Sequence, residues 1–511
     1  MNNNSILNAL KERDNIKLTE NLGIARKSTL DAVYDLWSFG GAYRKRSEAD
    51  CILLFKNAFE QDESMALKCL FYLRDIRGGQ GERRFFRICF KWLCDNHPEA
   101  AKRNLDYVSE FGRWDDLIYT AADTKLEDYM LFKIKEQLVL DLDCKTPSLL
   151  GKWLPSENAS SYTTTKMANK VRKYLKMTHK QYRKVLSSLR TKINIVEKLM
   201  SENRWDEIEF DKIPSRAGLI YRNAFARRDL IQQKYKEFIK SEKTTVNTKD
   251  LYPYDIVAKA TKMFDWWGEL KADVDEIEKE SLEKYWSQLP NYFKDDNTSM
   301  LCVVDTSGSM QGSEAAAPIN IAISLGMYAG ERARGPFKDH YISFSSRPQL
   351  IRIEGVDFVD KVRRIYATNL CENTNLTAVF DLLKEMVLTG AAKVEDLPDR
   401  ICVISDMEID SGTRDYGRYG YSYDYGNPWS KDNTRTTMER IRQEWEALGL
   451  KMPKLIYWDV DARSNTVLDL GPDVTLVSGA SASTFEMVTK DVTGIELMRE
   501  KLLSERYECI N

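Results

Sequence analysis

The stretch MLCVVDTSGS, Met300 to Ser309, decides the fold of the C-terminal part of the chain. Five apolar residues are followed directly by Asp305 and then by a run of hydroxyl side chains. A short apolar run bounded by turn residues is typical of a strand buried in a sheet. A buried strand that ends in oxygen-bearing side chains predicts a site at its C-terminal end.

Four later runs have the same character and alternate with helical stretches. The runs are HYISFSS, DRICVIS, PKLIYWDV and DVTLVS, and the helical stretches include INIAISLGMYAGERA and LTAVFDLLKEMV. Strands that alternate with amphipathic helices predict a mostly parallel sheet covered on both faces. We therefore expect residues 296–511 to form a doubly wound α/β domain, with the domain boundary inside QLPNYFKDDNTS, Gln288 to Ser299.

The first half of the chain has a different period. From about Asp50 to Trp286, apolar residues recur at helical spacing, as in ESMALKCLFYLRDI and ERRFFRICFKWLC. The segment RGGQGER interrupts this pattern and predicts a tight turn between two helices. We expect residues 1–295 to form an α-helical domain of HEAT-like stacked helix pairs, and a single irregular bundle is the alternative. Trp114 in RWDD and Trp153 in KWLP are the expected packing anchors.

Composition limits the compartment and the chemistry. The chain has 511 residues, is 43% hydrophobic and has nine cysteines, none of them in a CxxC pair. Unpaired thiols within apolar runs indicate a reducing compartment and argue against a zinc site. The first residues lack a basic region followed by an apolar core, and no window approaches 18 apolar residues. We expect a cytoplasmic protein that binds no membrane.

Positive charge is concentrated in one segment although the formal net charge is only -2. Residues 160–240 contain 20 lysines and arginines against 8 acidic residues, a net +12. Such cations, with tyrosines between them, can contact phosphates and stack on bases, whereas a charge run is also common on a solvated helix face. The candidate RNA-binding residues are Lys166, Lys170, Arg172, Lys173, Lys176, Lys180, Arg183, Lys184, Arg190 and Lys192.

The strand end at Asp305 has the composition of a metal site. In an open α/β sheet, ligands bind beyond the C-terminal ends of the strands. Asp305, Ser307 and Ser309 offer hard oxygen ligands, and Gly308 is expected to permit the turn that brings the two hydroxyls together. Such ligands suit Mg²⁺ or another divalent cation. The alternative is a helix N-cap beside an ordinary loop aspartate.

Two later stretches strengthen the metal interpretation. Asn373-Thr374-Asn375-Leu376 offers a hydroxyl at a helix start, and Ile401 to Asp406 is another apolar strand that ends in a carboxylate. This order resembles the von Willebrand factor A domain and its metal-ion-dependent adhesion site. The resemblance implies that Asp305, Ser307, Ser309, Thr374 and Asp406 hold the metal, with Thr377 second to Thr374. It also implies an open coordination position that a partner's carboxylate fills.

Hydrolysis at such a metal would need a base that activates water. Glu408 and Asp410 lie near in DMEID, but a surface acidic loop explains them equally well. We therefore expect no enzymatic activity. The tyrosine-rich segment from Gly412 to Asn433 follows the same strand and is interpreted either as a contact loop or as a flexible insertion.

The helical half resembles a known RNA-binding module. FYLRDIRGGQGERRFF and EFGRWDDLIY are similar to the TROVE module, and more so to families in which a TROVE-like helical region precedes a von Willebrand A domain. The resemblance implies Ro-like binding of structured or misfolded noncoding RNA, with a Mg²⁺-dependent A domain that recruits a protein partner through a carboxylate. No DNA partner is expected. The alternative is a metal-dependent protein assembly module that binds no RNA.

Overall fold

The computed structural model describes residues 5–193, 195–265, 267–293, 298–344, 348–367, 375–409 and 435–511. The chain divides into two compact units. Unit one consists of Met1–Ser47, Lys56–Asp62 and Leu251–Leu502, and unit two of Glu48–Phe55, Glu63–Asp250 and Leu503–Asn511. The predicted combination of a helical part with an α/β part is confirmed. Helix α3 (Glu48–Gln61) is divided between the units, and no described helix is long and apolar enough to cross a membrane.

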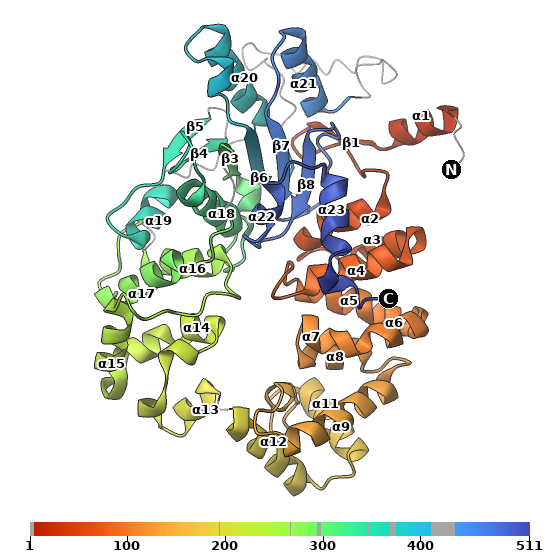
Figure 1. Ribbon diagram of the computed structural model, residues 1–511, viewed down its shortest axis with the longest axis vertical. Helices are drawn as coiled ribbons and strands as arrows, with labels where there is room; N and C mark the ends of the chain where they lie inside the picture. The colour runs from red at the N-terminus through yellow and green to blue at the C-terminus, as the bar shows by residue number, and fades with distance from the viewer. Residues whose placement is uncertain are drawn as a thin grey trace. The chain divides into compact units, whose positions relative to one another are not determined.

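The described residues of unit one include a six-stranded sheet of order β5-β4-β3-β6-β7-β8 (Figure 1). All neighbours are parallel except the edge strand β5, which is antiparallel to β4. Five of the strands are those that the sequence predicts, and β5 is additional. The bounds are β3 (Met300–Asp305), β4 (His340–Phe344), β5 (Gln349–Arg352), β6 (Arg400–Ser405), β7 (Lys454–Asp459) and β8 (Val474–Ser478).

Helices cover both faces of this sheet. The chain passes from β3 to β4 in one direction and from β5 to β6 in the other, so right-handed crossovers place α18 and α20 on opposite faces. Gly326 of α18 packs closely on Val304, since a Cβ at Gly326 would lie 2.5 Å from the valine methyl group. The helices of this part are α18 (Pro318–Arg332), α19 (Phe358–Ala367), α20 (Leu376–Leu388), α21 (Thr437–Ala447), α22 (Thr484–Val488) and α23 (Gly494–Leu502).

Unit one also contains segments from the first 295 residues. Helix α2 (Ala32–Phe39) packs on the edge strand β8, where the Tyr34 hydroxyl accepts a hydrogen bond from the Leu476 amide at 3.1 Å. Helices α16 (Pro253–Ala260) and α17 (Glu276–Ser287) pack on each other and on α18 and α19. Helix α1 (Ser5–Asp14) and strands β1 (Ile16–Leu18) and β2 (Ile24–Arg26) precede α2. The predicted boundary between residues 295 and 296 therefore falls inside unit one.

Unit two is helical. Successive helices pack on one another, as α4 does on α5, α5 on α6 and α8, and α14 on α15. The bounds are α4 (Glu63–Arg74), α5 (Arg83–Asn96), α6 (Pro98–Asn104), α7 (Val108–Phe111), α8 (Trp114–Ala121), α9 (Glu127–Asp143), α10 (Leu150–Trp153), α11 (Tyr162–Tyr174), α12 (His179–Ile193), α13 (Val196–Ser201), α14 (Ser215–Arg227) and α15 (Asp229–Lys240) (Figure 1).

The RGGQGER segment forms the turn between α4 and α5. A Cβ on Gly79 would overlap the carbonyl oxygen of Tyr72, so only glycine fits there. The end of the chain packs on the same turn: Arg506 is paired with Asp75, and the Tyr507 hydroxyl donates to the Asp75 carboxylate at 3.0 Å. Tyr507 is fully buried and packs against Tyr72 and Phe111. The turn therefore contributes to the packed interior of unit two.

A buried ion-pair network lies beside this turn. Asp116, at the start of α8, accepts hydrogen bonds from the Arg74 guanidinium and from Arg87 Nε, the latter at 2.6 Å. The Arg113 amide also donates to it at 3.0 Å. Arg74 and Asp116 are both inaccessible to water. The main anchor of the RWDD segment is therefore Asp116, since Trp114 is only half-buried.

Candidate functional site

The candidate site lies where the strand order of the sheet reverses. Strand β3 has β4 on one side and β6 on the other, so the connections leave this point in opposite directions. Asp305 is the last residue of β3, and Asp406 directly follows β6. Parallel neighbours end at the same edge, so both carboxylates lie at the crevice where open α/β sheets bind ligands.

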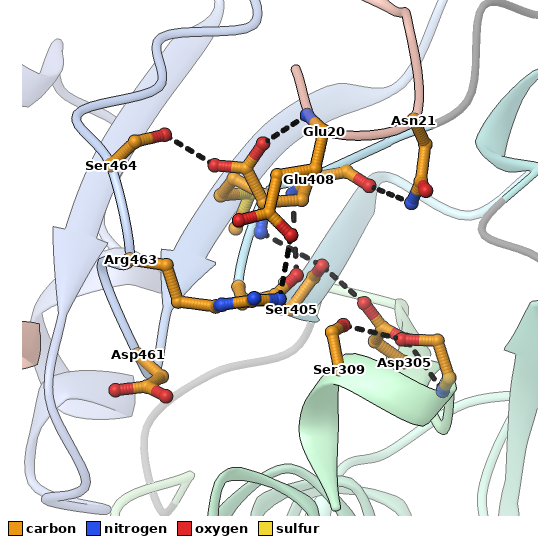
Figure 2. A network of polar contacts seen from close by, with 12 residues as sticks. Glu20, Asn21, Asp305, Ser309, Ser405, Glu408, Asp461, Arg463 and Ser464 are labelled. Atoms are coloured by element: carbon orange, nitrogen blue, oxygen red, sulfur yellow. Dashed lines mark hydrogen bonds and ion pairs between the residues drawn. The ribbon is translucent and has the colours of Figure 1, made fainter.

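Hydrogen bonds from Ser307 and Ser405 orient Asp305. Its Oδ1 accepts from the Ser307 amide at 2.9 Å. Its Oδ2 accepts from the Ser405 hydroxyl at 2.5 Å (Figure 2). The Ser307 and Ser309 hydroxyl oxygens are 2.9 Å apart, so the turn does bring them together. The expected need for Gly308 is wrong, because a Cβ there would meet nothing within 4 Å and its φ is not positive.

Asp406 is a buried carboxylate with an open oxygen. The side chain is inaccessible, and Oδ2 accepts no hydrogen bond from any residue within the described ranges. Burial first, and then the charge of Asp305, raises the pKa of Asp406 to about 7, while a hydrogen bond from Ser309 acts in the opposite direction. A cation placed between the two carboxylates would favour their charged forms and so offset both effects.

Three parts of the sequence interpretation lie outside the described residues. They are Thr374, Asp410 and the segment from Gly412 to Asn433. The second candidate, Thr377, lies in the first turn of α20, two residues after the N-cap residue Asn375. The contribution of a Thr374 hydroxyl to the site therefore stays a prediction.

Glu408 has a structural role at this edge. It is buried, and its carboxylate accepts hydrogen bonds from the Ser464 hydroxyl and from the Glu20 amide, the latter at 2.7 Å (Figure 2). The Asn21 side chain donates to the Glu408 carbonyl at 2.6 Å. Glu408 is thus not part of a surface acidic loop. It fixes the turn between β1 and β2 to the end of β6.

Arg463 was not among the predicted site residues. It follows β7, the next strand of the sheet, and its Nη1 lies 3.9 Å from the open Oδ2 of Asp406. The same nitrogen is paired with the Glu20 carboxylate at 2.8 Å. An apolar strand that ends in a carboxylate predicts the site at Asp305 and Asp406, and the same pattern occurs at the end of β7. In contrast, nothing in the sequence brings Glu20 to this edge.

The residues fit a divalent cation that is held largely by hydroxyls. Within the described ranges, no group of three or more carboxylate, imidazole or thiol side chains is placed to hold a metal. The predicted set has only two carboxylates and depends on serine and threonine oxygens, directly or through water. Mg²⁺ accepts such a set because it usually keeps several waters and uses few carboxylates.

The predicted RNA-binding cations lie on α11, on α12 and in the turn between them, and they fall into two groups. Five are held by neighbours within unit two: Lys170 is paired with Asp123 at 2.5 Å, Arg172 with Glu157 at 2.9 Å, and Arg190 donates to the Leu154 carbonyl at 3.0 Å. Lys166 is 3.8 Å from Asp123, and Lys192 donates to the Leu142 carbonyl at 2.6 Å.

The other five cations are exposed and have no ion pair within the described part of the chain. Lys173 lies in the last turn of α11, and Lys176 lies in the following turn with a φ of 53°. Lys180, Arg183 and Lys184 share one face at the start of α12. We name these five residues the basic corner. The basic corner is thus the half of the predicted set that forms no ion pair within the described residues.

Comparison with known proteins gives two family models that together span most of the chain. The domain of unknown function DUF2828 matches residues 19–137 and 149–298, and the domain of unknown function DUF7788 matches residues 299–506. The uncharacterized protein L728 of Acanthamoeba polyphaga mimivirus is 25% identical over 520 residues, which cover 93% of this chain and 84% of that protein.

These matches overturn the family resemblance inferred from the sequence. The identification as a TROVE/Ro-like protein fused to a von Willebrand A domain is wrong, because the two halves match two different families. The physical reason is that the segments behind it are not specific to one family. RGGQGER is a packed turn between two helices, and a strand that ends in Asp and Ser recurs in many α/β sheets.

Proposed function

The chain belongs to the DUF2828 family, and from the geometry of its strand ends we propose that it is a divalent-cation-dependent binding protein and not an enzyme. Asp305, Ser307, Ser309 and Asp406 hold Mg²⁺, with a hydroxyl from the Thr374 region as a further ligand. The open coordination position takes a carboxylate from a protein partner. We also propose, for architecture alone, that the sheet follows the plan of a von Willebrand A domain.

One observation carries this proposal. Asp406 has a carboxylate oxygen that is fully buried and accepts no hydrogen bond from any residue within the described ranges, beside the oriented carboxylate of Asp305. Two buried carboxylates at one strand edge are costly unless a cation or a proton compensates them. Glu408 is engaged by the turn between β1 and β2, which makes this carboxylate a poor base for the activation of water.

The test is calorimetric titration with Mg²⁺ of the wild-type protein, Asp406→Asn and a matched control, Asp399→Asn. Asp399 lies just before β6, at the opposite end of the same strand, and accepts hydrogen bonds from Ser299. We expect Asp406→Asn to weaken Mg²⁺ binding more than about tenfold because a ligand is lost, and the control to leave it unchanged. Equal affinity in all three proteins would refute the site.

A second candidate function rests on the basic corner. We propose that unit two is a HEAT-like stack of helices and that it binds RNA through these five cations. No acidic side chain among the described residues neutralises these five cations, whereas the other predicted cations are held by neighbours. This difference supports the proposal. Exposed, unneutralised lysines and arginines release counterions when they contact phosphates, so binding would weaken steeply with salt.

Reversal of the basic corner tests this candidate. The variant changes Lys173, Lys176, Lys180, Arg183 and Lys184 to Glu, and affinity for a labelled RNA hairpin is measured by fluorescence anisotropy at physiological salt. We expect a loss of more than about tenfold. A control changes five exposed lysines elsewhere in unit two to Glu: Lys91, Lys135, Lys145, Lys243 and Lys249. An equal loss of affinity in this control would show that only net charge matters.

A further inference from the structure

We infer that Arg463 selects a carboxylate ligand at the edge of unit one. In the free protein, the Glu20 carboxylate is paired with Arg463 in place of this ligand. The inference rests on the proposed metal site and names the chemistry of its partner. Arg463 Nη1 is 2.8 Å from the Glu20 carboxylate and 3.9 Å from the open oxygen of Asp406. The guanidinium therefore borders the Asp406 carboxylate that would hold the metal.

The backbone of the turn that carries Glu20 is held in place by hydrogen bonds. The Glu20 amide donates to Glu408 at 2.7 Å, and the Thr19 hydroxyl donates to the Ile409 carbonyl at 2.5 Å. Leu22 has a φ of 67°, and its amide closes the turn on the Thr19 carbonyl at 3.1 Å. The backbone of this turn is fixed, so the Glu20 side chain can leave Arg463 while the turn stays in place.

Exposure distinguishes the Arg463 pair from the structural contacts around it. The side chains of Arg463 and Glu20 are 37% and 51% exposed, whereas Glu408 and Asp406 are almost completely buried. An ion pair with this exposure adds little stability, so an incoming ligand can replace Glu20 at low cost. A guanidinium matches the planar carboxylate group with two parallel donors, which favours a carboxylate over a neutral ligand.

The charge of Arg463 also opposes a cation at Asp406. Removal of this charge by Arg463→Met should raise the affinity for Mg²⁺, and removal of its counter-charge by Glu20→Gln should lower it. The two variants therefore change metal affinity in opposite directions. A role of Arg463 in stability alone predicts no such opposition.

The experiment measures binding of the full chain to a carboxymethylated sensor surface in saturating Mg²⁺, with an uncharged hydroxyl surface as reference. We expect Glu20→Gln to bind several-fold more tightly than wild type, Arg463→Met to bind more than tenfold more weakly, and EDTA to abolish binding. The matched controls replace other exposed, ion-paired side chains of unit one. They are Glu12→Gln, which removes the partner of Arg26, and Arg352→Met, which removes the partner of Glu354. Both should behave as wild type.

The outcomes separate this inference from the proposed function. If Mg²⁺ binds as titration predicts but Glu20→Gln and Arg463→Met recognise the carboxylated surface as wild type does, Arg463 does not select the ligand. The same conclusion follows if neither wild type nor Glu20→Gln recognises the surface in Mg²⁺. If Mg²⁺ does not bind, or binds Asp406→Asn equally well, the metal site itself is refuted and the inference falls with it.

Discussion

Replacement of Asp116 by alanine is expected to lower the stability of unit two by about 3–5 kcal/mol, because it leaves the buried Arg74 without its counter-charge. Arg74 and Asp116 are both inaccessible, and Arg87 loses a hydrogen bond at the same time. The turn that begins α8 loses the acceptor of the Arg113 amide as well. We expect this to be the most damaging single change in unit two.

Hydrogen exchange followed by mass spectrometry measures this effect within the unit. Peptides from α4, α5 and α8 should exchange by an opening reaction whose free energy falls by that amount. Asp106→Ala is the matched control, since Asp106 forms an exposed ion pair with Lys133 at 2.9 Å and should contribute less than about 1 kcal/mol. Equal exchange in Asp116→Ala and Asp106→Ala would contradict the importance assigned to the buried network.

Replacement of Asp406 by asparagine is expected to stabilise unit one when divalent cations are removed. In the folded protein, burial and the charge of Asp305 raise the pKa of Asp406 to about 7, against an ordinary value of 3.8. The folded state therefore binds the proton more tightly, and its stability falls as pH rises from about 4 to about 7. Asparagine removes this loss, which reaches about 4 kcal/mol at most above pH 7.

The check is the opening free energy of β3 and β6 by hydrogen exchange at pH 5 and pH 8 in EDTA. The difference between Asp406→Asn and wild type should be larger at pH 8, and Mg²⁺ should then stabilise the wild type alone, because it binds the folded state. Asp399→Asn serves again as the control at the other end of β6. A difference that does not depend on pH would show that Asp406 does not titrate as expected.

Much of the sheet could be predicted because its signal is local. Buried parallel strands are continuous apolar runs, so MLCVV and RICVI identify β3 and β6 without other information. The carboxylates that follow them share one edge by the geometry of parallel strands. This is why Asp305 and Asp406 could be placed together from the sequence, whereas the short, exposed edge strand β5 carries no such pattern.

The remainder depends on contacts between segments far apart in the chain. Glu20 reaches Arg463, and Tyr34 reaches Leu476, across more than 400 residues, and no periodicity records either contact. The basic tract illustrates the same limit, since sequence gives the ten cations equal weight. The folded structure distinguishes them, because some cations lie beside an acidic residue such as Asp123 or Glu157 and the cations of the basic corner do not.

The most direct test of the central claim is anomalous diffraction from crystals of the full chain soaked in Mn²⁺, which prefers the same oxygen ligands as Mg²⁺. The proposed site predicts an anomalous peak between the carboxylates of Asp305 and Asp406, close to the hydroxyls of Ser307 and Ser309, and no peak in Asp406→Asn. A wild-type map without density at this edge of the sheet, or with Mn²⁺ bound only elsewhere, would contradict a metal-dependent binding function.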